Sequence, residues 1–396
     1  MALQQQALIA GGGIGGLAAA LACAQAGWLV RIYERATALA EVGAGIQLGP
    51  NAVRVLRGFG LDAALAAVAA RPERLCVRDA THGALLGQLR LGRRALDRYG
   101  APYLTLLRSD LHAALLDAAH RHDGVHFNLN SRVEAVSQNE LAVQLMTSDG
   151  LTVEGDALIG ADGLWSAVRE HLLADGLPHE TGHLAYRALL RQADLPQAQR
   201  CQDSVIAWLG PHMHAVQYPV RGGEWLNLVI VVQGSSAGLA ADWDQAGPAE
   251  DLRAAMGAVC APLRELVDQI ELWRMWVLHE RAPMSGPQQQ AQGRVALLGD
   301  AAHPMRPYLA QGAGMAIEDA EELGRALALG ELDVPLRLRR YALNRWRRNA
   351  RVQRRSQRNG QIFHATGPLR WGRDLAMKLL GERLLDLPWL YGKNWP

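Results

Sequence analysis

The sequence has few cysteines and almost no lysine. Its four cysteines are scattered and form no C-x-x-C pair: Cys23, Cys76, Cys201 and Cys260. This pattern argues against a zinc site or a disulfide framework, and it is typical of a reducing compartment. Lysine occurs only at positions 378 and 393, so nearly all the positive charge is arginine. We interpret this as a composition bias without functional meaning, and we predict no metal site.

Long apolar runs and a strong net charge are also absent. The longest apolar run, Ile14 to Ala26, is broken by glycine and glutamine and is too short to span a bilayer. No signal-peptide pattern precedes the first predicted strand, which starts at about Ala7. The formal net charge is only +2, which gives no electrostatic reason to bind nucleic acid. These absences predict a cytoplasmic enzyme, and 396 residues allow a substantial core.

The first functional pattern is a glycine-rich stretch between a predicted strand and a predicted helix. Residues 11–16 read GGGIGG and contain G-x-G-x-x-G at Gly11, Gly13 and Gly16. Glu34 ends the next predicted strand, about twenty residues later. Glycines let backbone amides approach a pyrophosphate at the helix N-terminus, and the acid can accept a hydrogen bond from a ribose hydroxyl. The pattern predicts a dinucleotide and does not distinguish FAD from NAD.

Two later segments repeat the order of strand, acid and helix. In the first, Asp162-Gly163 follows the predicted strand Ala157 to Gly160, and Ser166 lies near a helix start. By itself, such an Asp-Gly turn is more often structural than functional. In the second, Gly299-Asp300 follows the strand at 295–298, and a helix begins near Gln311. This second segment suits a ligand that has hydroxyls and a delocalised negative charge, as a reduced flavin does.

The middle of the chain has a different texture. Between residues 186 and 278 the apolar runs are short, and Gly222-Gly223 predicts a hairpin turn. We interpret this as a sheet-rich second domain inserted into the first. The predicted division is an FAD-binding domain at 1–70, 106–180 and 281–359, a substrate domain at 71–105 and 181–280, and a helical C-terminal segment at 360–396.

Together, the three motifs resemble the class A flavoprotein aromatic hydroxylases, which are FAD-dependent monooxygenases with the p-hydroxybenzoate hydroxylase fold. The likeness covers nearly the whole chain and includes the stretches 41–47, 50–51 and 108–111, and Trp276 followed by Arg281 and Pro283. It implies an α/β (mixed α+β) fold. A Rossmann-like FAD-binding domain would be interleaved with an antiparallel-sheet substrate domain, followed by a helical C-terminal segment.

The resemblance also implies which residues hold tightly but non-covalently bound FAD. The helix start at 312–315 would place backbone amides at the flavin pyrimidine ring, where reduction adds negative charge. NAD(P)H would bind transiently over the same groove. The implied FAD residues are Gly11, Gly13, Ile14, Gly15, Gly16, Glu34, Arg35, Gly45, Gln47, Arg108, Asp162, Gly163, Asp300, Pro307, Gly312, Ala313, Gly314 and Met315.

The implied reaction is hydroxylation of a small hydroxylated aromatic acid with O2 and NAD(P)H through a flavin C4a-hydroperoxide. Within the family, the chain resembles the 3-hydroxybenzoate 6-hydroxylases on the stretches 99–103 and 214–224. That likeness implies Tyr103, His214 and Tyr218 as the residues that meet the substrate. From the residues alone, His214 and Tyr218 also fit a core histidine and a core tyrosine on one face of a strand.

The substrate stays open because the chain departs from this subgroup. The subgroup has a glutamine where Pro307 stands, and the stretch 305–308 is nearer to the 6-hydroxynicotinate 3-monooxygenases. Those enzymes, however, have histidines where this chain has Gln47 and Tyr308. Salicylate hydroxylases are a third relative, so decarboxylative hydroxylation of salicylate or 6-hydroxynicotinate is the alternative reaction.

Other classes of protein also have a sequence basis. Residues 234–238 match G-x-S-x-G, so an α/β-hydrolase with Ser236 as nucleophile and His303 or His364 as base is a formal alternative. A non-catalytic flavin-binding protein is another. Ten arginines at 337–358 suggest a nucleic-acid arm, although apolar residues at helical spacing favour a solvated helix face. The apolar stretch 384–391 is compatible with burial or with a homodimer contact.

Overall fold

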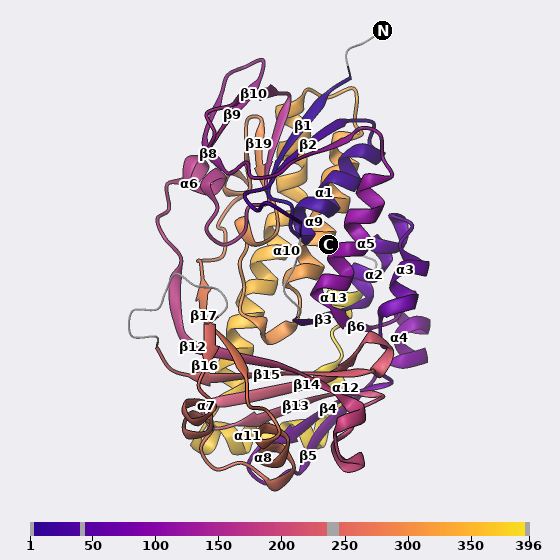
Figure 1. The fold of residues 1–396 in the computed structure, drawn as a ribbon, viewed down its shortest axis with the longest axis vertical. Helices are drawn as coiled ribbons and strands as arrows, with labels where there is room; N and C mark the ends of the chain where they lie inside the picture. The colour runs from indigo at the N-terminus through magenta and orange to yellow at the C-terminus, as the bar shows by residue number, and fades with distance from the viewer. Residues whose placement is uncertain (1–3, 40–43, 236–244, 393–396) are drawn as a thin grey trace.

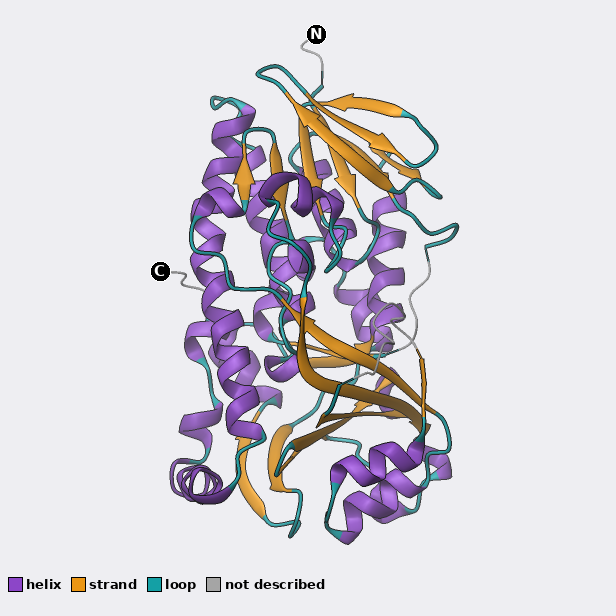
Figure 2. Cartoon of the chain, turned by 90° about the vertical axis from the view of Figure 1, so that its left-hand side faces the viewer, coloured by secondary structure: helices purple, strands orange, loops and turns teal. Residues whose placement is uncertain are grey.

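A computed structural model describes residues 4–39, 44–235 and 245–392. The molecule is elongated, with sheets near both ends and long helices between and beside them (Figure 1). In Figure 2 the smaller sheets lie toward the N-terminus, and a large twisted sheet lies toward the opposite end. Within the described ranges, no helix combines the length and apolar character that crossing a membrane requires.

The first large sheet has six strands in the order β18-β19-β11-β1-β2-β7, and only β18 runs antiparallel to its neighbour. Strands buried on both faces explain the continuous apolar runs in the sequence. This arrangement confirms the predicted Rossmann-like sheet. Its strands are β1 (Gln6–Ala10), β2 (Leu29–Tyr33), β7 (Val125–Asn128), β11 (Ala157–Gly160), β18 (Ala291–Gln292) and β19 (Val295–Leu297).

The helices beside this sheet include α1 (Ile14–Gln25), α5 (Arg108–His120) and α9 (Gly312–Leu327). Helices α1 and α9 touch closely: a Cβ at Gly324 would lie 3.0 Å from the Ala22 carbonyl oxygen. The helix α5 has Leu107 as its N-cap and has no side-chain cap. The other elements here are α2 (Pro50–Gly58), α3 (Asp62–Val68), α4 (Gly92–Tyr99), α6 (Ala167–Leu173), β3 (Gly45–Leu48) and β6 (Leu104–Leu107).

A small antiparallel sheet is formed by β8 (Val133–Gln138), β9 (Val143–Thr147) and β10 (Thr152–Gly155). The run that begins at Val125 does not belong to it, because that run forms β7 and pairs in parallel with β2.

The second large sheet has eight strands in the order β16-β17-β12-β15-β14-β13-β4-β5. One face packs on α7 (Ala249–Met256) and α8 (Ala261–Asp268) through a core that includes Ala215, Leu228 and Leu252. The other face contacts Leu107 and Tyr308, from segments next to the first sheet. The strands are β4 (Arg74–Asp79), β5 (Leu85–Arg90), β12 (His179–Arg191), β13 (Ser204–Gly210), β14 (Met213–Val220), β15 (Trp225–Gln233), β16 (Gln245–Gly247) and β17 (Trp273–Glu280).

The helix α10 (Val334–Phe363) connects the two halves, because it contacts β19 near its start and reaches the large sheet at its end (Figure 1). It continues through the predicted boundary between residues 359 and 360. The chain then forms α11 (Gly367–Leu380), α12 (Glu382–Leu385) and α13 (Pro388–Tyr391). Arg348 of α10 and Arg54 of α2 donate to main-chain carbonyls of α13, so this last helix is fixed against the middle of the molecule.

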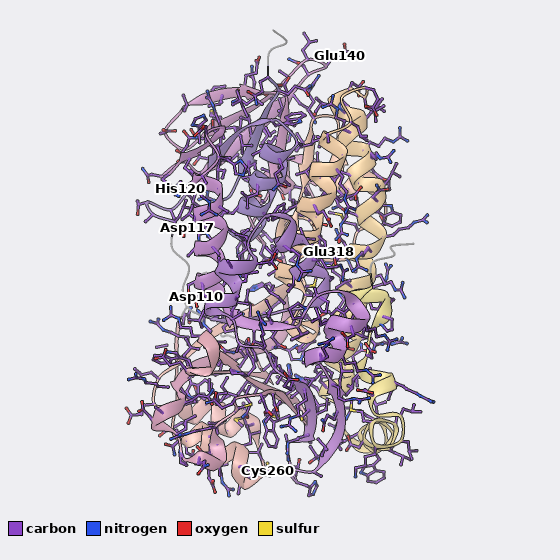
Figure 3. The ribbon with its side chains drawn as sticks, turned by 90° about the vertical axis from the view of Figure 1, so that its right-hand side faces the viewer. Asp110, Asp117, His120, Glu140, Cys260 and Glu318 are labelled. Carbon is purple, nitrogen blue, oxygen red and sulfur yellow. The ribbon has the colours of Figure 1, made fainter. Side chains whose placement is uncertain are left out.

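Buried charges join α9 to α10. The Asp319 carboxylate accepts hydrogen bonds from Arg345 Nε at 2.7 Å, from His303 Nε2 and from the Gly299 amide. The neighbouring Glu318, labelled in Figure 3, lies in the middle of the molecule and pairs with Arg345 at 3.0 Å and with Arg348 at 2.8 Å. Although burial opposes ionisation, His303 and Arg345 hold the pKa of Asp319 far below its ordinary value.

Removing one partner of this network leaves buried charge without compensation. We expect Arg345→Leu to lower the free energy of unfolding by about 3–5 kcal/mol, measured by urea unfolding of the holoenzyme. Arg325→Leu is the matched control, because Arg325 pairs with Glu321 at the surface and such pairs contribute about 0–1 kcal/mol. Equal losses in the two variants would contradict the importance of the buried network.

Candidate active site

The glycine loop at 11–16 is crowded on one side and open at the helix start. Gly11 has φ +101°, and a Cβ there would lie 2.5 Å from the Ala161 carbonyl oxygen. The helix α1 begins at Ile14 with neither a side-chain cap nor an acid in its first turn. Its first amides therefore have no side-chain acceptor, which is what an anion-binding helix start requires. The buried His112, which the sequence did not single out, donates to the Gly12 carbonyl at 2.8 Å.

Glu34 lies beside this loop. Its carboxylate accepts hydrogen bonds from the Gly12 amide at 2.7 Å and from the Ala36 amide at 2.9 Å. Arg35, next to it, is exposed. The acid is therefore in the place expected for a ribose contact, and its main-chain partners hold it there.

Asp162 has a more structural environment than expected. Its carboxylate accepts hydrogen bonds from Ser166 Oγ and from the Ala167 and Val168 amides, so it caps the start of α6 together with Ser166. Gly163 has φ +79°, and a Cβ there would meet open space. Asp162 thus stabilises the turn through its hydrogen bonds, and the free space beside the turn lies next to Gly163.

The flavin end of the predicted site is the turn at Gly299-Asp300 and the start of α9. Asp300 is exposed, while Gly299 donates its amide to the buried Asp319. The helix α9 begins at Gly312, where a Cβ would meet open space, and it has no side-chain cap and no acid in its first turn. Along this helix start Ala313 is half-buried, whereas Gly314 and Met315 are buried. Pro307 begins a short turn of helix and is exposed.

These residues fit FAD. The helices α1 and α9 follow two of the sequence motifs and begin without a side-chain cap or a first-turn acid, as α11 also does, whereas Ser166 caps α6 and Asp333 caps α10. Uncapped amides and the positive end of a helix dipole stabilise a pyrophosphate, and they stabilise the anionic pyrimidine ring of a reduced flavin equally well. Arg108 lies at the start of α5, and its backbone amide donates to the Ala44 carbonyl at 2.7 Å.

On the substrate side, Tyr103, Gln47 and Tyr218 meet. Tyr103 donates its hydroxyl to Gln47 Oε1 at 2.8 Å, and Gln47 also acts on the Tyr218 hydroxyl, where it partly offsets the rise in pKa that burial causes. Burial raises the pKa of both tyrosines, so both hydroxyls stay protonated. Asn227 of β15, which the sequence did not single out, accepts from the Gly45 amide at 2.8 Å and ties β3 to the large sheet.

His214 lies on the same face of β14 as Tyr218 but has different neighbours. Its ring centroid is 4.9 Å from Tyr308 and 5.4 Å from Phe363, and its Nδ1 is 2.8 Å from Nε2 of His364. The structure therefore brings Tyr103, Gln47 and Tyr218 together and places His214 apart from them. Strand geometry puts the two positions about 13 Å apart along β14.

Burial keeps this histidine cluster neutral. It lowers the pKa of His214 well below 6.5, and it lowers that of His364 to about 3 with help from neighbouring cations. The pKa of His183, whose ring centroid is 5.0 Å from that of His364, is also lowered by burial. His214 is thus a neutral imidazole near pH 7, with one nitrogen able to accept a hydrogen bond and a weaker basicity than a free histidine has.

Some residues on the face of the eight-stranded sheet that carries His214 and Tyr218 were not predicted from the sequence. Arg187 of β12 is buried, lies opposite Val229 on the same face, and stacks over the Trp276 ring at 5.0 Å. A positive charge within a predicted strand was the available clue. His364 comes from the C-terminal end of α10, about 150 residues beyond His214, and no local pattern connects the two.

The residues of the hydrolase alternative are not assembled in the described part of the chain. Ser236 lies outside the described residues. His303 is bonded to Asp319, and His364 is bonded to His214, so each candidate base already has another partner.

Comparison with known proteins agrees with the geometry. A family described as an FAD binding domain matches residues 4–356. This chain belongs to that FAD-binding family. It is an FAD-dependent aromatic monooxygenase, and enzymes of this type use NAD(P)H as the reductant.

Similar proteins cover nearly all of this monooxygenase. A 3-hydroxybenzoate 6-hydroxylase of Polaromonas naphthalenivorans is 38% identical over 98% of this chain and 96% of its own. A 6-hydroxynicotinate 3-monooxygenase of Bordetella bronchiseptica is 37% identical over 89% of this chain and 90% of its own. The solved structure of Klebsiella pneumoniae HpxO complexed with FAD and uric acid has a TM-score of 0.83 and 26% identity, covering 96% and 94% of the two chains.

A variant at the glycine loop tests the FAD fit. We expect Gly11→Ala to abolish bound FAD, measured as flavin absorbance of the purified monooxygenase, because the new Cβ would collide with the Ala161 carbonyl. Gly27→Ala is the matched control: Gly27 has φ +85° but open space around it, so it adds only backbone strain of about 1–2 kcal/mol. A yellow Gly11→Ala protein would refute the crowding argument.

The neutral histidines predict acid sensitivity. Between pH 6.5 and the lowered folded-state pKa, the unfolded chain binds protons that the folded enzyme does not. The free energy of unfolding therefore decreases as the pH is lowered. Each of His214 and His364 contributes a slope of about 1.4 kcal/mol per pH unit in this window. We expect urea unfolding of the holoenzyme to show this loss below pH 6.5, and His364→Gln to reduce the slope by about one histidine. An unchanged slope would show that His364 is not neutral in the folded state.

Proposed function

We propose that the enzyme hydroxylates 3-hydroxybenzoate at position 6. The observation that carries this proposal is the joint placement of Tyr103, Gln47 and Tyr218 at one end of a sheet face and of His214 at the other. The sequence relatives named 3-hydroxybenzoate 6-hydroxylase support it over nearly the whole chain. Position 6 is para to the ring hydroxyl. When that hydroxyl shares its proton with a base, the electron density of the ring rises at the para position.

The proposed binding mode uses both ends of this face. The substrate's ring lies on the apolar surface of Val216 and Val229, which face each other between His214 and Tyr218. Arg187, opposite Val229, attracts the carboxylate, and the hydroxyls of Tyr218 and Tyr103 orient it. A ring nitrogen of His214 accepts the hydrogen bond of the substrate's hydroxyl. The apolar walls exclude water, so that turnover stays coupled to product.

The cofactor residues have complementary proposed roles. FAD, when bound, supplies the electron transfer and the activation of O2. The amides at 312–315 hold the flavin's pyrimidine edge, Asp300 meets the ribityl chain, and the loop at 11–16 with Glu34 holds the ADP half. Gly45, Gln47 and Pro307 border the ring between cofactor and substrate, and Arg108 contacts the nucleotide from the start of α5. The open turn at Gly163 lies where a transient NAD(P)H would approach.

Decarboxylative hydroxylation is the second candidate. The 37% identity to a 6-hydroxynicotinate 3-monooxygenase favours this candidate. Tyr308, which lies beside His214, counts against it, because a histidine is expected at that place in those enzymes. The two reactions differ in product mass, because decarboxylation replaces the carboxyl group with the new hydroxyl.

A homodimer is a separate proposal. The apolar side chains of Trp371, Leu375 and Leu379, spaced four residues apart on α11, are exposed, and a second copy would cover them. Light scattering of the holoenzyme gives the mass in solution, and a monomer at all concentrations would rule this assembly out.

A substrate screen tests the proposed function. We expect NADH or NADPH oxidation to be stimulated most by 3-hydroxybenzoate among 3-hydroxybenzoate, salicylate, 4-hydroxybenzoate and 6-hydroxynicotinate. The product should gain one oxygen and keep its carboxyl group, as measured by mass spectrometry. Loss of the carboxyl group from salicylate or 6-hydroxynicotinate as the preferred substrate would replace the first proposal with the second. A yellow enzyme that no aromatic acid stimulates would instead favour a flavin-binding protein.

We expect His214→Ala to retain FAD and to lower the rate of hydroxylated product by about 100-fold, since hydrogen-bond and proton transfer at a reacting group contribute on that order. NADH oxidation should fall less than product, so the ratio of product to NADH drops. His126→Ala, at an exposed histidine of β7, is the control and should behave as wild type. Unchanged product in His214→Ala would remove His214 from the mechanism.

A further inference from the structure

His214 shares a hydrogen bond with a histidine from the far end of the chain. Its Nδ1 lies 2.8 Å from Nε2 of His364, and the two residues are 3% and 6% exposed. Two neutral imidazoles at this distance share one proton, because one nitrogen must donate and the other must accept. The tautomers of His214 and His364 are therefore coupled, because the proton between them is carried by only one of the two nitrogens.

The backbone of His364 is held by two hydrogen bonds, and the helix end before it is packed closely. Its own amide donates to the Gly360 carbonyl at 3.1 Å, and its carbonyl accepts from the His212 amide at 3.3 Å. The Tyr308 ring packs against the backbone of Gly360, where a Cβ would lie 2.8 Å from the Tyr308 ring. Because α10 is anchored to α9 by buried ion pairs, His364 has a fixed position relative to β14.

Burial keeps the pair neutral, and the charges around it add to this effect. His183 from β12 faces both rings, and His212, Arg306 and Arg373 face His364 from the neighbouring turn, loop and helix. Tyr308 lies against both rings and stays protonated because burial raises its pKa. No carboxylate is among the groups that shift either histidine, so a proton added to the pair is poorly stabilised.

We propose that His364 is a positioning residue that accepts the Nδ1 proton of His214 and thereby presents the bare Nε2 to the substrate's ring hydroxyl. This inference rests on the proposed function, in which His214 accepts a hydrogen bond from a phenol. Only an imidazole with its proton on Nδ1 can do so through Nε2. The other tautomer would present an N–H, which cannot accept a hydrogen bond from the hydroxyl.

A double-mutant cycle tests this role with His214→Phe, His364→Phe and the double variant. We expect His364→Phe to keep FAD and to lower kcat for coupled hydroxylation by about 10-fold or more, as is usual for partners that orient a functional histidine. KM should change less than kcat. In the His214→Phe background the same change should cost nothing further, because His364 acts through His214. Independent, multiplying losses would overturn the proposal.

Two more variants separate positioning from simple packing. His364→Gln keeps an amide oxygen able to accept the Nδ1 proton, and we expect it to restore most of the product rate. His183→Phe is the matched control, since His183 touches His364 but shares no hydrogen bond with His214, and it should retain the wild-type rate. If His364→Gln is as impaired as His364→Phe, or if His183→Phe is equally impaired, the cluster acts by packing and the proposal fails.

Nitrogen NMR of the histidine-labelled holoenzyme gives a readout without turnover. We expect His214 to show a protonated Nδ1 and a bare Nε2, and His364→Phe to change this pattern. A protonated Nε2 in the wild-type enzyme would overturn the inference about His364. Failure of every hydroxybenzoate to be hydroxylated would overturn the proposed function instead, so the two failures are distinguishable.

Discussion

The paired carboxylates of Glu318 and Asp319 are the constraint on which the rest of this structure depends. Two buried negative charges at adjacent positions of α9 are tolerated only if every oxygen has a donor, and the donors come from far apart in the chain. Arg345 and Arg348 bring α10, and the Gly299 amide brings the turn that precedes the flavin end of the site. The position of the α9 N-terminus is thereby set by charge pairing as well as by apolar packing.

That anchoring is transmitted to the substrate side by one long helix. The helix α10 starts beside the six-stranded sheet, passes the buried carboxylates and ends at His364, where it meets His214 of the large sheet. Arg348 also holds carbonyls of α13, which places Tyr391 next to Tyr103. Both ends of the proposed substrate site are thus anchored to the same buried network of charges. This anchoring is a physical reason for the cofactor half and the substrate half to stay in fixed positions relative to each other.

The substrate question is concentrated in a few positions. Gln47 accepts a hydrogen bond from Tyr103 and lowers the pKa of the Tyr218 hydroxyl, so its amide belongs to the polar end of the proposed site. Tyr308 packs on His214 at the other end, and its bulk is accommodated because Gly360 has no side chain. Pro307 begins the turn that carries Tyr308. The positions at which the sequence departs from its relatives are therefore near the proposed ring site, where a change in shape alters which acid fits.

The sequence by itself determined the cofactor half of this protein. The motifs at 11–16, 162–163 and 299–300 are local, because a turn between a strand and a helix needs only neighbouring residues, and the Rossmann-like sheet followed from the apolar runs before them. Only the tertiary structure decided the rest. The strand at Val125 joined the parallel sheet. The partner of His214 came from 150 residues away, because side chains on different elements meet only once both sheets and α10 are packed together.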